Sequence, residues 1–179
     1  MCRNRKAEAV DVLNQCIAPH VVSEGVWDAW MLLGEAYQID QNFADAMTIY
    51  TKVFRECPHT LPQAWMARIT LGEIAPLANA TESADSIFVD VARSGHPFPL
   101  PRLIARFYAG NVSEAQFLAQ WQRLRPGDNF YLFYCAQRAL LHREKVVANV
   151  YVQKLVQSVQ PETWDRLLAG SLLHTIDKQ

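Results

Sequence analysis

Residues 27–60 read WDAWMLLGEAYQIDQNFADAMTIYTKVFRECPHT and contain two apolar faces with helical spacing, separated by a polar run at 40–42. A glycine inside a helix costs about 1 kcal/mol relative to alanine, so Gly34 indicates that a second helix approaches closely. Ala46 offers the matching small surface, Tyr37 and Tyr50 fill the space around it, and Pro58 ends the second helix. The stretch therefore predicts a hairpin of two helices that meet at a glycine.

The order of these residues resembles the tetratricopeptide (TPR) repeat, whose period is about 34 residues. The positions that match the repeat in spacing are Trp30, Leu33, Gly34, Tyr37, Ala46, Tyr50 and Pro58, while Val53 stands where the repeat usually has alanine. The resemblance implies an all-α fold, a right-handed α-solenoid of antiparallel helix hairpins with about ten helices. It also implies a single domain over residues 1–179, with its best repeat at 27–60.

Weaker copies of the pattern follow the best repeat. They are expected at 61–97, 99–126 and 129–161, and a covering helix is expected at 162–176. The helices expected within these copies span 63–75, 100–109, 113–125, 129–142 and 145–159. Gly110 is expected to end one helix, and Ser113 to cap the next, with Glu114 in its first turn. Arg68 stands where the second repeat would carry its glycine, which indicates that the later copies are degenerate.

The beginning of the chain resembles only the second helix of a hairpin. Its apolar residues are Ala9, Val10, Leu13 and Cys16, within a helix expected at 5–17. Without a first helix to cover it, this helix leaves an apolar side exposed. The pattern predicts either self-association through this end or a chain that belongs to a longer array.

Composition excludes several classes of protein. The chain has 179 residues, of which 50% are hydrophobic and 11% aromatic, enough for a core and too many for a disordered tail. Lysine and arginine number 17 against 18 aspartate and glutamate, so no nucleic-acid partner is expected. No apolar run approaches the roughly 20 residues of a membrane span, and no signal peptide is visible. These features predict a cytoplasmic protein, or an envelope-associated bacterial protein if the chain is a fragment.

The sequence offers little support for catalysis. The 4 cysteines are widely spaced, and the 5 histidines show no paired ligand spacing. We therefore expect no catalytic residues, no metal site and no cofactor. Cys57 and Cys135 would carry the less favoured alternative, a thiol-dependent enzyme, but their helical positions indicate packing.

A binding surface is the remaining expectation. In TPR arrays the first helix of each hairpin lines a concave groove that holds a partner peptide. The predicted groove residues are Asp28, Met31, Glu35, Gln38, Trp65, Ile69, Phe130, Phe133 and Gln137, together with Arg102 and Arg106, which could grip a partner carboxylate. Chaperone-binding TPR proteins hold an acidic tail with lysine and asparagine, but Met31 and Glu35 stand at those positions. A basic or amphipathic protein or peptide partner is therefore expected.

Two finer resemblances concern bacterial proteins. The stretch 30–50, LGEIAPLANA at 71–80 and AQWQRL at 119–124 resemble the TPR modules of cytochrome c maturation proteins, which chaperone apocytochrome c. FYAGNVSE at 107–114 and NFYLFY at 129–134 are similar to the NlpI family of envelope lipoproteins. Together the patterns predict a non-catalytic interaction adaptor or assembly chaperone. A fixed structural subunit of a multiprotein complex is the alternative.

Overall fold

The computed structural model describes residues 11–12, 15, 24–78, 80–159 and 163–178. Within these ranges all of the regular secondary structure is α-helical, which confirms the predicted all-α class. The helices are α2 (Glu24–Ile39), α3 (Phe43–Glu56), α4 (Pro62–Ile74), α5 (Ala84–Arg93), α6 (Pro99–Tyr108), α7 (Glu114–Leu124), α8 (Tyr131–Leu141), α9 (Lys145–Ser158) and α10 (Trp164–Lys178). The helix expected at 5–17, with its predicted self-association, lies mostly outside the described residues.

Local sequence sets where these helices begin and end. Ser113 caps α7 as predicted, because its Oγ accepts a hydrogen bond from the Gln116 amide at 3.3 Å. In return the Gln116 side chain accepts from the Ser113 amide at 2.9 Å, which completes a capping box. Gly110 ends α6 in a left-handed conformation, with φ of 74°. The helix ends predicted around 100–109 and 113–125 are thereby confirmed.

Gly34 lies against an aromatic ring of the second helix. A Cβ atom at Gly34 would lie only 2.6 Å from Cζ of Tyr50, so the ring of α3 sits directly on the backbone of α2. Gly72 of α4 has the same environment, because a Cβ there would lie 2.6 Å from Cε1 of Phe88 in α5. Ala46 is fully buried in the core beside Tyr50.

The same spacing of a small and a larger buried residue recurs in four consecutive helix pairs, and in the first two pairs these residues are in contact. In each pair a small buried residue of the first helix precedes a larger buried residue of the second by sixteen positions. The pairs are Gly34 with Tyr50, Gly72 with Phe88, Ala105 with Trp121, and Ala136 with Val152. A small residue at this position lets the second helix approach the first closely.

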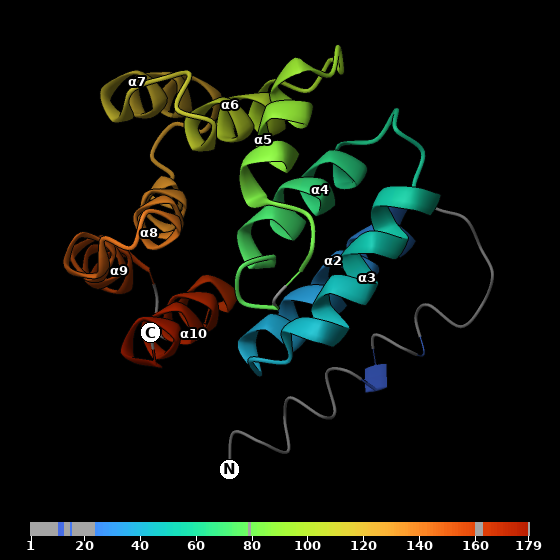
Figure 1. The fold of residues 1–179 in the computed structure, drawn as a ribbon, viewed down its shortest axis with the longest axis horizontal. Helices are drawn as coiled ribbons and strands as arrows, with labels where there is room; N and C mark the ends of the chain where they lie inside the picture. The colour runs from blue at the N-terminus through green and yellow to red at the C-terminus, as the bar shows by residue number, and fades with distance from the viewer. Residues whose placement is uncertain (1–10, 13–14, 16–23, 79, 160–162, 179) are drawn as a thin grey trace.

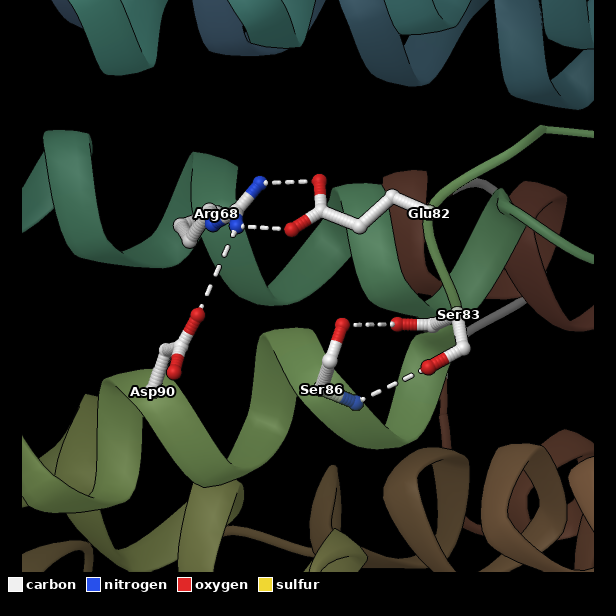
Figure 2. Close-up of polar contacts among 5 residues, drawn as sticks. All are labelled: Arg68, Glu82, Ser83, Ser86 and Asp90. Carbon is white, nitrogen blue, oxygen red and sulfur yellow. Dashed lines mark hydrogen bonds and ion pairs between the residues drawn. The ribbon is translucent and has the colours of Figure 1, made fainter.

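The second glycine of this series is Gly72. A repeat of 34 residues, counted from Gly34, would instead put the glycine at position 68, which is an arginine. The offset between the first two pairs is 38 residues, and Arg68 has a different role. Figure 2 shows its guanidinium donating to both carboxylate oxygens of Glu82, with 2.8 Å from Nη1 to Oε2. Asp90 Oδ2 lies 4.0 Å from the same guanidinium, and Ser83 caps α5. These contacts fix the connection between α4 and α5.

The last helix returns to the first described one (Figure 1). Helix α10 packs against α9 and also against α2, at the turn that joins α2 to α3. There the Gln41 amide donates to Ser171 Oγ at 2.8 Å and to Thr175 Oγ1 at 3.2 Å. Ser171 Oγ in turn donates to the Gln38 carbonyl at 2.9 Å. The helix expected at 162–176 is therefore α10, and it contacts both the preceding helix, α9, and the first helix of the series, α2.

Candidate functional site

A cavity of about 450 Å³ lies between the C-terminal ends of α4 and α8. Its apolar walls include Leu77, which follows α4, and Leu140 and Leu141 of α8. Two polar side chains line it while being almost completely buried, Glu73 of α4 and Gln137 of α8. The volume is within the usual range for sites that hold small groups or side chains.

Glu73 is the buried acid of this cavity, and only 4% of its surface is exposed. The hydroxyl of Tyr108, from α6, donates a hydrogen bond to its Oε1 at 2.6 Å. Burial raises the pKa of Glu73 to about 7, although the Tyr108 hydrogen bond opposes the rise and the nearby Glu35 adds to it. Near neutral pH the carboxyl group is therefore present in both protonation states.

Gln137 is the second buried polar group, also 4% exposed. Neither of its amide atoms is among the described polar atoms that are both buried and unpartnered, and the residue lines the cavity. Gln38 is also buried, and its Oε1 accepts from the Tyr50 hydroxyl at 2.8 Å. Because it lines the cavity, the Gln137 side chain is placed to hydrogen-bond a group that enters.

Two cations complete the lining. Arg143 lies in the turn between α8 and α9, and Lys145 begins α9; both are exposed. Arg143 has φ of 62°, a left-handed conformation that favours glycine. The cavity thus combines a buried acidic and amide lining, leucine walls and exposed positive charge. Such an arrangement offers apolar contact, hydrogen-bonding groups and charge in one place.

Of the eleven predicted groove residues, only Gln137 lines this cavity. Ile69 was expected on the groove surface but has no exposed surface, because it packs in the core. Phe133 is also buried and stacks on the half-buried Phe130, with ring centroids 5.0 Å apart. Gln38 is held by Tyr50, so its side chain is committed to the fold.

The predicted groove residues of α2 and α4 lie apart from the cavity. Asp28 is exposed and accepts a hydrogen bond from Gln63 at 2.8 Å, while Met31 and Glu35 are half-buried. Trp65 stacks on His96, with ring centroids 4.5 Å apart, and lies against the tilted ring of His59, with centroids 5.1 Å apart.

The two predicted arginines of α6 also lie outside the cavity lining. Arg102 is half-buried and its guanidinium donates to the His96 carbonyl. Arg106 is exposed to solvent. The pair is therefore divided, with one guanidinium bound to the backbone and the other at the surface.

The sequence does contain a signal for Glu73. The tripeptide LGE occurs at 33–35 and again at 71–73, so Glu73 is the counterpart of Glu35 at the 38-residue offset. A search at a strict 34-residue period does not find this match, because it compares Glu35 with position 69 instead of position 73. Arg143 and Lys145 show no comparable signal, since exposed cations are common in any sequence.

The described thiols are poor nucleophiles. Cys57 and Cys135 are both free and buried. Burial raises the pKa of Cys135 to about 12 and also raises that of Cys57, so both thiols stay protonated near neutral pH. Across the described ranges, no three histidine, cysteine, aspartate or glutamate residues gather as a metal site would require.

None of the helices that the structure describes has both the length and the apolar character needed to cross a bilayer. Comparisons with protein-family models, with curated proteins and with solved structures found no match for this chain.

Proposed function

We propose that this protein is a TPR-like right-handed α-solenoid that acts as a non-catalytic adaptor or assembly chaperone. The observation that carries the proposal is the cavity between α4 and α8, which is lined by leucines and by the buried residues Glu73 and Gln137. A buried carboxyl group is costly to keep in a protein that only needs to fold. A segment of a partner protein would offer charge and hydrogen bonds to this lining.

The recurrent spacing of small and large buried residues supports a repeat architecture. The same small-to-large pair occurs in four helix pairs, as Gly34 and Tyr50 do in the stretch that resembles a TPR repeat. Helices that are already packed need little ordering on binding, so the entropic cost falls mainly on the partner. We assign partner binding to the cavity side of α4 and α8, because α10 covers the end of α2.

A peptide-display selection against the purified full chain tests this function. We expect selected peptides to bind wild-type protein and to lose affinity when Leu77, in the cavity wall, is replaced by glutamine. Val146→Gln is the matched control, because Val146 is 80% exposed and does not line the cavity. Peptides that bind both variants equally well, or a selection that yields no binder, would contradict the proposal.

A fixed structural subunit is the second candidate. It is favoured by three exposed valines on α9, namely Val146, Val147 and Val150. Exposed apolar side chains that lie close together mark interaction surfaces in many proteins. Co-purification of a stoichiometric partner from native extract, abolished by Val146→Lys, would support this candidate over transient peptide binding.

A further inference from the structure

We infer that the cavity between α4 and α8 takes a basic residue with a free carboxylate, the chemistry of a lysine or arginine at the C-terminus of a partner. This inference rests on the proposed function, because it names the partner segment that the cavity receives. Three features of the lining carry it: a buried carboxyl group beside an amide, leucine walls, and two exposed cations.

The buried lining suits a cation. Glu73 forms no ion pair with any residue that the structure describes, and its hydrogen bond from Tyr108 engages Oε1. Gln137 adds an amide oxygen to the same lining. An ammonium group has three hydrogens to donate and no acceptor, so the carboxylate and the amide oxygen complement it. A guanidinium group offers five donors to the same acceptors.

The walls and the exposed cations suit the rest of such a residue. The aliphatic stem of lysine or arginine would pack against Leu77, Leu140 and Leu141, as these stems do on apolar surfaces. The carboxylate at the other end would meet Arg143 and Lys145, which are exposed and positively charged. A basic residue inside a chain would lack this carboxylate and leave both cations unmatched.

Proton release gives the inference a thermodynamic signature. The charged and titratable groups around Glu73 come from several elements: Glu35 of α2, Tyr50 of α3, Tyr108 of α6, Tyr134 of α8, and the exposed Arg143 and Lys145. Against this background burial raises the pKa of Glu73 to about 7, so part of the population carries the proton at pH 7. A bound cation favours the carboxylate, so binding should release protons.

Calorimetric titration of the full chain with four probes tests the inference. The first is acetyl-Gly-Ala-Ala-Lys with a free carboxylate, the second is its C-terminal amide, and the third has norleucine in place of lysine. The fourth is Nα-acetyl-lysine, which has both charges but no peptide. We expect the first probe to bind, and the amide and norleucine peptides to bind at least about tenfold more weakly. Titration in two buffers of different ionisation enthalpy measures the proton release.

Variants connect the binding to the cavity. Glu73→Gln keeps the shape and the acceptor for Tyr108 but removes the charge, and we expect the affinity for the lysine peptide to fall at least about tenfold. Arg143→Gly removes an exposed side chain at a backbone position that glycine prefers, so folding is not at risk. It should weaken the lysine peptide but leave the amide peptide unchanged. Arg123→Ala, an exposed cation outside the cavity lining, is the control.

The outcomes separate this inference from the proposed function. Equal binding of the norleucine and lysine peptides would overturn the inference while leaving a peptide-binding adaptor in place. Failure of all four probes to bind would also overturn it, and the display selection would then judge the adaptor by itself. Binding of acetyl-lysine as tight as that of the peptide would support the charge arrangement but contradict partner binding, because nothing beyond one residue would be recognised.

Discussion

Gly34 and Gly170 both lie inside helices, but their surroundings are opposite. A Cβ at Gly34 would press on the Tyr50 ring at 2.6 Å, whereas nothing lies within 4 Å of one at Gly170. Gly34→Ala should therefore lower the free energy of unfolding by about 1–3 kcal/mol through overpacking. Gly170→Ala should raise it by about 0.5–1 kcal/mol, because alanine favours the helix. Urea unfolding of both variants measures the difference, and effects of the same sign would reject this packing.

Glu73 makes the stability of the protein depend on pH. Its pKa is raised from 4.5 to about 7 on folding, so the folded state binds the proton more tightly than the unfolded state. The stability it contributes is fully present below pH 4.5 and is lost as the pH rises through 7, in total by about 3 kcal/mol. Glu73→Gln does not titrate, so its stability relative to wild type should increase between pH 5 and pH 8.

Urea unfolding at several pH values measures this relative stability. Glu82→Gln is the control, because Glu82 is exposed and its pKa is lowered, chiefly by the hydrogen bond from Arg68. A constant difference in stability between Glu73→Gln and wild type at every pH would contradict a raised pKa at Glu73.

At the scale of elements, two turns have the same strained backbone but different side-chain contacts. Gln41, between α2 and α3, and Arg143, between α8 and α9, both have φ of 62°. Glycine relieves this conformation, so Arg143→Gly should stabilise the protein by about 1 kcal/mol. Gln41→Gly gains the same relief but loses the hydrogen bonds to Ser171 and Thr175, each worth about 1 kcal/mol.

Thermal unfolding and hydrogen exchange compare these two glycine variants. Gln41→Gly should have the lower melting temperature and should expose the amides of α10 to faster exchange than Arg143→Gly does. Equal stabilisation by both substitutions would show that the contact between Gln41 and α10 contributes nothing to the joining of the chain ends.

Helix positions were predictable because the signals that set them are local. Ser113 caps α7 and Gly110 ends α6 through bonds that span only a few residues. Helix α8 begins at Tyr131, two residues later than the predicted 129, and its cap, Phe130, makes no side-chain capping bond. Gly72 was missed for a different reason, since finding it requires the 38-residue offset of the first two pairs.

At the scale of the whole molecule, accessibility of the thiols distinguishes a helical adaptor from a thiol-dependent enzyme. Cys57 and Cys135 are buried, and burial raises the pKa of both. We expect iodoacetamide to label neither residue in the native protein and both after unfolding, as peptide mapping by mass spectrometry would show. Rapid labelling of Cys135 in the native protein would instead support the enzyme.

The joining of the two ends could not be predicted from the sequence. Contact between Gln41 and Ser171 spans 130 residues, and it depends on the rotation accumulated over all the helices between them. The cavity depends on the same rotation, because Glu73 and Gln137 come from helices far apart in the chain. Of the predicted groove residues only Gln137 lines it, since periodicity identifies the face of a helix but not the neighbour opposite that face.

The most direct measurement of partner binding in this cavity is methyl NMR of leucine- and valine-labelled protein during titration with the lysine-terminated peptide. We predict saturable shifts of the Leu77, Leu140 and Leu141 methyl groups, which line the cavity, and unchanged signals from Val146 and Val150 on α9. Shifts confined to those valines, with the three leucines unmoved at saturation, would contradict binding between α4 and α8.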